Sequence, residues 1–184
     1  PLIFTAVMVV SLRIGFLPYH FAMVSSALIY ALSWSGLIFA LPFEITPILR
    51  SNLNHIAIAA AFLFACLLTR SLCGEATIGK LWSRFLFVGG IIPFAVTLIV
   101  MALAPNYSHL GSVVLHIVFI LPLAAVSGAL VTGAMRGLLI CRLQLIAWAT
   151  MMLYIVQRIQ KGMGLIGHNV FTEYGLYPSI ISEA

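Results

Sequence analysis

The sequence predicts an all-α protein, a polytopic bundle of membrane-spanning helices. Hydrophobic residues make up 63% of the chain and charged residues only 7%, whereas about a quarter of a soluble domain is charged. The apolar positions also form long continuous runs instead of alternating with polar ones. Because an open sheet edge cannot face lipid, continuous runs of this kind indicate helices. The whole chain, 1–184, is therefore expected to be one transmembrane bundle.

Polar residues mark the ends of the first three predicted spans. A helix needs about twenty mostly apolar residues to cross the hydrocarbon core of a bilayer. The first run, about 1–14, is shorter than that, and we interpret it as cut at its N-terminus. The second run covers about 21–41 and lies between two prolines. The third, about 52–68, follows a polar Arg-Ser-Asn step that starts at Arg50.

The second half of the chain predicts three further spans and an incomplete seventh. These runs cover about 81–104, 110–135, 143–158 and 171–184. Pro93 and Pro122 interrupt the first two of them, and we expect these prolines to kink their helices. The last run stops after about fourteen residues, short of a full span. The sequence thus predicts six spans plus a truncated seventh, and we interpret the chain as a fragment of a longer protein.

The basic residues predict that the N-terminus lies outside the cell. With that orientation the cytoplasmic segments carry six basic residues and the external ones three, as the positive-inside rule requires. We attribute the net charge of +5 to this topology and to contact with anionic lipid headgroups. No basic cluster with interleaved aromatic residues suggests nucleic acid. The expected cytoplasmic residues are Arg13, Arg70, Lys80, Arg84, Arg136 and Arg142, and the external ones are Arg50, Arg158 and Lys161.

The motifs that suggest chemistry do not support a catalytic site, so we expect no enzyme, cofactor or metal within this chain. Residues 162–167 match G-x-G-x-x-G, but a dinucleotide site requires a preceding strand. The only lysines, Lys80 and Lys161, lie outside the predicted hydrocarbon region, which excludes a retinal-type Schiff base. The cysteines form no C-x-x-C pair, and we interpret them as small buried apolar residues without disulfides. They are Cys66, Cys73 and Cys141.

Two histidines are placed deeply enough to bind a cofactor. His55 and His116 lie near the external ends of the third and fifth predicted spans, and paired intramembrane histidines can ligate haem iron. A haem or quinone site is therefore an alternative interpretation. Polar groups of this kind more often form hydrogen bonds between packed helices, and we favour that role.

Small residues and one acid are further candidate site residues. Ala129, Gly133 and Gly137 recur every fourth residue along the fifth span, a spacing that lets helix backbones approach closely. The contact is either internal to the bundle, which we favour, or the interface of a homodimer. Glu183 falls about twelve residues into the seventh run, and an ionisable group at that depth is a candidate intramembrane switch. A short or re-entrant helix that leaves Glu183 near water is the alternative.

The C-terminal third of the chain carries a resemblance to a known family. Residues 128–137 and 142–148 resemble helices five and six of the bacterial seven-transmembrane receptors with diverse intracellular signalling modules. Residues 164–166 and the stretch Phe171-Thr172-Glu173-Tyr174-Gly175 resemble that family's glycine-containing loop and the opening of its helix seven. The chain departs from the pattern at Pro178. Weaker matches lie at 11–13 with Tyr19, at 31–36 and at 68–72.

This resemblance implies the transmembrane core of a signalling receptor in the bacterial inner membrane. Family members usually carry an extracellular sensor domain before helix one and a cytoplasmic kinase, cyclase or phosphatase module after helix seven. The core itself is then expected to transmit a signal by shifting between two helix packings. The competing interpretation is an accessory membrane subunit that packs against a larger redox or photosynthetic complex. The expected partners are membrane lipid and either a second copy or such a complex.

Overall fold

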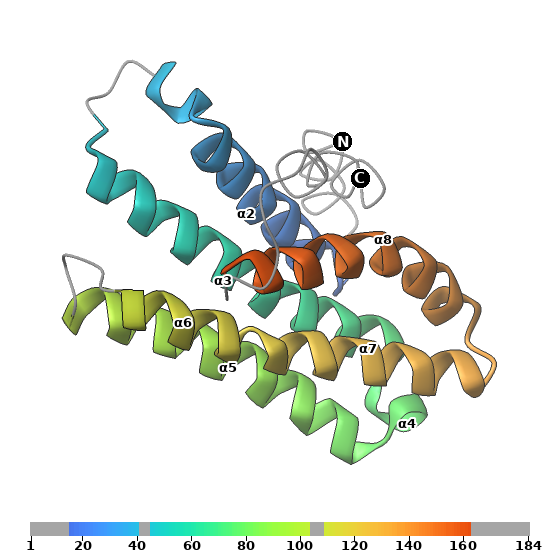
Figure 1. Ribbon diagram of the computed structural model, residues 1–184. Helices are drawn as coiled ribbons and strands as arrows, with labels where there is room; N and C mark the ends of the chain where they lie inside the picture. Colours follow the sequence, from blue (N-terminus) through green and yellow to red (C-terminus); the bar gives the residue numbers. More distant parts are fainter. Residues whose placement is uncertain (1–14, 41–44, 104–108, 163–184) are drawn as a thin grey trace.

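All regular structure in the described part of the chain is helical, which confirms the predicted all-α class. The computed structural model describes residues 15–40, 45–103 and 109–162. The predicted runs 1–14 and 171–184 lie outside these residues, so the number of spans and their orientation stay predictions. Figure 1 shows the helices, which are α2 (Leu17–Ser35), the 3-10 turn η1 (Leu37–Ala40), α3 (Pro47–Cys73), α4 (Glu75–Ile78), α5 (Lys80–Leu103), α6 (His109–Val118), α7 (Ile120–Met135) and α8 (Leu139–Gly162).

Three helical segments within these ranges are long and apolar enough to cross a membrane, judged by length and composition. They are Pro47–Cys73, Lys80–Leu103 and Val113–Met135, and a shorter apolar helix covers Leu139–Leu153. Large apolar side chains also remain exposed on the outer surface, among them Ile99 at 55% and Ile117 at 56%. An apolar exterior of this kind suits contact with lipid. The chain is therefore a multipass membrane-helix protein.

Local capping sets helix ends that composition alone places only approximately. Helix α3 begins at Pro47, five residues before the predicted start, because the Thr46 side chain accepts a hydrogen bond of 3.2 Å from the Leu49 amide. Proline also suits the first position of a helix. Helix α7 ends in a left-handed turn at Gly137 (φ 87°), where the Leu138 amide donates to the Gly133 carbonyl at 3.1 Å. This is a Schellman motif.

Proline divides the predicted span 110–135 but not the predicted span 81–104. Helices α6 and α7 are separated at Phe119, three residues before Pro122. Proline has no amide hydrogen to donate to the carbonyl four residues back, here that of Val118. Pro93, in contrast, lies inside a continuous α5.

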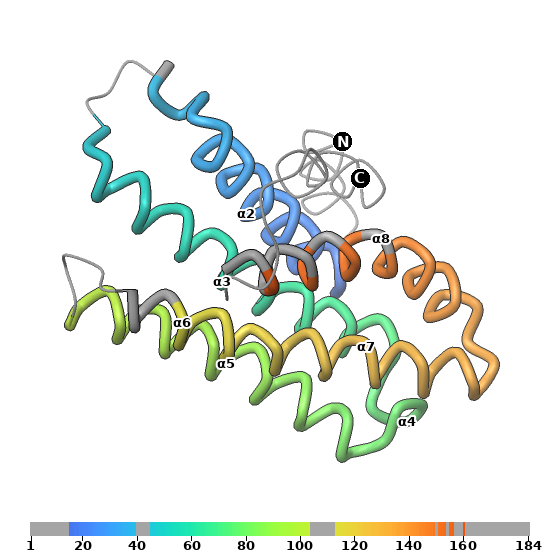
Figure 2. Tube along the Cα trace, in the orientation of Figure 1, coloured from blue at the N-terminus to red at the C-terminus, as the bar shows by residue number. Residues whose placement is uncertain are grey.

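Helix α3 is the centre of the bundle. It packs against α2, α5, α7 and α8, and Figure 2 shows α2 and α5 along it. Small residues permit the close contacts: a Cβ built on Gly90 of α5 would lie 3.2 Å from the Cβ of Cys66 on α3. A Cβ on Gly89 would lie 3.1 Å from that of Ala125 on α7. Close backbone approach is typical of membrane helices, because no hydrophobic effect drives them together in lipid.

Candidate functional site at one end of the bundle

A short connection joins the end of α3 to the start of α5. Helix α4 is a single turn between Gly74 (φ 68°) and Gly79 (φ 87°). Both glycines have a positive φ, a conformation that other residues adopt only at a cost. Ile78, 2% exposed, anchors the turn in the core. The connection 74–79 is thus an ordered turn that packs against α5 and α7.

The positive φ of Gly74 makes a testable prediction. We expect Gly74→Ala to destabilise the protein by about 1–3 kcal/mol, because the combination of φ 68° and ψ 143° at Gly74 is a strained backbone conformation that essentially only glycine adopts. No atom lies within 4 Å of the added Cβ, so the cost comes from the backbone alone. Gly15→Ala is the matched control, because it also meets open space but has no positive φ. Thermal unfolding in detergent compares the two variants, and equal melting temperatures would contradict the prediction.

A chain of hydrogen bonds through one buried hydroxyl joins α3, α4 and α5. The Nε of Arg70 donates to the Ser83 hydroxyl at 2.9 Å. That hydroxyl donates to Oε2 of Glu75 at 3.1 Å. Ser83 is fully buried, whereas Glu75 is exposed. A hydroxyl both accepts and donates, so Ser83 connects a cation to an anion without their direct contact.

Two further arginines extend this polar network to the turn between α7 and α8. Arg136 donates to the Thr77 carbonyl in α4, and the Nε of Arg142 donates to the Ala134 carbonyl at 3.3 Å. The guanidinium of Arg70 also lies 5.4 Å from the centre of the Phe87 ring, within the range of a cation–π contact. We name Arg70, Glu75, Ser83 and Arg136 the end cluster. Its contacts link α3, α4, α5 and α7.

Two buried cysteines lie in contact where α3 meets α8. Sγ of Cys73 on α3 is 2.7 Å from Sγ of Cys141 on α8. Gly133 of α7 makes this contact possible, because a Cβ there would lie 2.5 Å from Sγ of Cys141. Cys66 is buried as well, so burial of all three cysteines is confirmed. The sequence did not predict the contact between the Cys73 and Cys141 thiols, because residues 68 positions apart share no local motif.

Of the predicted helix-packing residues, two lie inside the bundle and the third lies in an exposed turn. Ala129 is fully buried and Gly133 is buried against Cys141, so these two face other helices of the same chain. Gly137 is exposed in the turn after α7, so the helical ridge of small residues ends at Gly133. Gly128, beside the ridge, packs against the ring of Trp82. Glu183 lies outside the described residues.

The two histidines remain candidates for packing or for a cofactor. Nδ1 of His55 lies 2.7 Å from the Ser51 carbonyl on the same helix, α3. His116 lies on α6 and is half-buried. No group of three or more His, Cys, Asp or Glu side chains that could hold a metal ion occurs within 15–40, 45–103 and 109–162. The haem or quinone interpretation is tested by neither observation and stays a prediction.

The fold places the chain in the class of multipass helical membrane bundles. In this bundle the end cluster joins the ends of several helices through polar side chains. Comparison with known families identifies the family within this class. The family described as 7TM diverse intracellular signalling matches residues 1–184. The chain belongs to this family, which confirms the resemblance seen in the sequence. It is the transmembrane region of a membrane signalling protein. No curated protein and no solved structure matches the chain.

Proposed function

We propose that this chain is the noncatalytic transmembrane core of a bacterial inner-membrane receptor, which passes an extracellular signal to a cytoplasmic output module. The family assignment supports a signalling role. The observation that carries the finer proposal is the end cluster, because it ties four helices together at the end where basic residues gather. Lys80, Arg84 and Arg142 lie there and are exposed. By the positive-inside rule that end faces the cytoplasm, where an output module would receive the signal.

Transmission requires an element with two discrete packings. The connection 74–79 suits this role, since it is held by side-chain hydrogen bonds from other helices and not by a long helix of its own. Movement of α3 relative to α5 would break the bond between Arg70 and Ser83, and movement of α4 with it would break the bond between Ser83 and Glu75. A ligand outside the membrane would shift the balance by its differential affinity for the two packings.

The test replaces Ser83 by alanine in the full-length gene product. We expect this variant to lose about 1–3 kcal/mol of stability, the cost of leaving hydrogen-bonding groups unpaired. We also expect it to change the ratio of basal to stimulated output. Output activity in membrane vesicles and thermal unfolding in detergent measure the two effects.

The exposed serine Ser71 on α3 provides the matched control. Ser71→Ala should leave both the stability and the output ratio unchanged. A Ser83→Ala protein that is less stable but keeps the normal output ratio would contradict a role in transmission. A full-length gene product without an output module would exclude the receptor and favour the accessory subunit, whose neighbours crosslinking would identify.

A further inference from the structure

Two thiols that are far apart in the sequence face each other inside the bundle. Sγ of Cys73 lies 2.7 Å from Sγ of Cys141, and the two side chains are 3% and 0% exposed. Both cysteines are free in the structure. The sulfur atoms of a disulfide are about 2.05 Å apart, so a relative movement of about 0.7 Å brings this pair to bonding distance. The folded bundle therefore holds two thiols where a disulfide can form.

A third helix supplies the space for the two sulfur atoms. A Cβ built on Gly133 of α7 would lie 2.5 Å from Sγ of Cys141 and 3.8 Å from Sγ of Cys73. A side chain at this position would occupy the space that the Cys141 sulfur fills. The third cysteine, Cys66, has different surroundings, because its Cβ faces Gly90 of α5. The glycine thus belongs to the Cys73–Cys141 pair.

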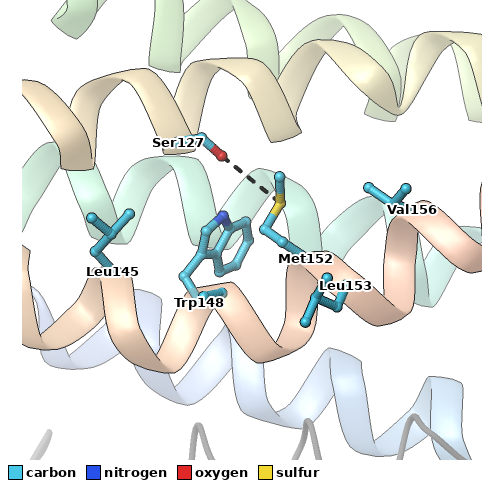
Figure 3. Close-up of a pocket in the computed structure, with 7 residues that line it drawn as sticks. Ser127, Leu145, Trp148, Met152, Leu153 and Val156 are labelled. Atoms are coloured by element: carbon cyan, nitrogen blue, oxygen red, sulfur yellow. Dashed lines mark hydrogen bonds between the residues drawn. The ribbon is translucent and has the colours of Figure 1, made fainter.

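Contacts farther along α8 hold Cys141 in this position. Trp148 follows Cys141 by seven residues, so the two side chains lie on the same face of the helix, and Trp148 is 2% exposed. Figure 3 shows Trp148 and Met152 beside α7, where they line an open apolar groove and the Ser127 hydroxyl donates to the Met152 sulfur at 3.8 Å. These contacts fix the position of α8 on α7, so the two thiols stay together in the folded bundle.

The cover over the two sulfur atoms is thin. Cys73 is the last residue of α3, directly before the connection 74–79, and Cys141 is the third residue of α8. Glu75, two residues after Cys73, and Ile140, directly before Cys141, are exposed. Turns at helix ends open more readily than a packed core, and burial keeps a thiol inert while the cover is closed. A small uncharged oxidant therefore reaches the thiols when the connection opens.

We propose that Cys73 and Cys141 form a reversible redox site, in which a hydroperoxide oxidises the two thiols to a disulfide between α3 and α8. One sulfur attacks the hydroperoxide, the O–O bond breaks, an alcohol or water leaves, and a sulfenic acid forms. The second sulfur attacks the sulfenic sulfur, so the S–S bond forms and a water molecule leaves. The thiols lose two electrons and two protons, and the hydroperoxide takes up both. A dithiol reverses the reaction, because it becomes a disulfide itself and returns the hydrogen atoms to the two cysteines.

The position of this bond gives it a regulatory effect. On the cytoplasmic side, where we place this end of the bundle, thiols are kept reduced and disulfides are usually transient and redox-sensing. The bond would tie the last residue of α3 to α8, three residues after Arg70 of the end cluster. It would hold α3 in the packing described above and so change the basal output. This effect on output rests on the proposed function, whereas formation of the bond does not.

Peroxide treatment of the full-length gene product in membrane vesicles tests the site. Remaining thiols are blocked with N-ethylmaleimide after denaturation, mass spectrometry identifies linked and free cysteines, and non-reducing electrophoresis separates linkage within one copy from linkage between copies. We expect Cys73 and Cys141 to link within one copy at least tenfold faster than Cys66 is oxidised, and dithiothreitol to release them. Cys66 is the internal control, because it is also buried on α3. Equal oxidation of all three cysteines, no linkage, or linkage between two copies only would overturn the inference.

Variants separate the chemistry of the site from its effect on output. Ser83→Ala loosens the connection 74–79 and should speed the linkage severalfold, whereas Ser71→Ala should not, and equal rates would contradict access through this connection. Peroxide should change the basal output activity of the unsubstituted protein but not that of Cys141→Ala. Linkage without any change in output would overturn the regulatory effect alone. Absence of linkage would overturn the redox site and leave the proposed function untouched, because linkage is measured by mass and not by output.

Discussion

Replacing Gly128 by alanine is expected to destabilise the protein by about 2 kcal/mol. A Cβ at this position would lie 2.0 Å from Cη2 and 2.4 Å from Cζ3 of the Trp82 ring, far inside van der Waals contact. The indole is rigid, so either the whole Trp82 side chain must leave its position or α5 and α7 must move apart. Overpacking costs about 1–3 kcal/mol, which exceeds the gain of up to about 1 kcal/mol from replacing glycine in a helix. Thermal unfolding in detergent measures the loss as a lower melting temperature.

Two control variants make the interpretation specific. Ala124→Val enlarges an exposed residue of the same helix and should leave the melting temperature nearly unchanged. Trp82→Leu removes the ring, so adding Gly128→Ala in that background should cause no further loss. If Gly128→Ala lowers the melting temperature equally with and without the Trp82 ring, contact between these two residues is not the cause.

A leucine at Gly133 is expected to have a still larger effect, with loss of most folded protein. The Cβ of any side chain here would lie 2.5 Å from Sγ and 3.1 Å from Cβ of Cys141. Cys141 lies on α8, and Sγ of Cys73 on α3 is also within 4 Å of that Cβ, so the added side chain would meet two other helices. We expect a destabilisation of about 3 kcal/mol or more, at the upper end of overpacking costs. Size-exclusion chromatography and thermal unfolding report the folded fraction.

A milder pair of variants separates steric conflict from other causes. Gly133→Ala alone should destabilise the protein, and Cys141→Ala should restore most of that loss because it removes the closest atom, Sγ. Full stability and unchanged signalling of Gly133→Leu would mean that Gly133 faces lipid, and the small-residue ridge would then have no role in the packing. Since Gly133 and Ala129 are buried in one chain, we expect the variant to act through the fold of the monomer and not through a dimer interface.

The sequence by itself determined the class of this protein. Continuous apolar runs leave the helix as the way to satisfy backbone hydrogen bonds in lipid, so the all-α class followed without any knowledge of packing. The interruption of the helix near Pro122 and the close helix packing at Gly133 were also predicted from local chemistry. The resemblance to the family was most specific in residues 128–137 and 142–148, and the match of the family to residues 1–184 confirms it.

Only the tertiary structure decided which residues meet at the end of the bundle. Arg70, Glu75 and Ser83 are polar residues near helix ends, which are common in any membrane protein, and nothing in their spacing predicts one hydrogen-bonded chain. Cys73 and Cys141 pair because Gly133, on a third helix, leaves room for a sulfur atom. The sequence predicted that Gly137 would continue the ridge, but the left-handed turn after α7 removes it from the helix. Such contacts depend on the relative positions of three or more helices, and no local pattern encodes them.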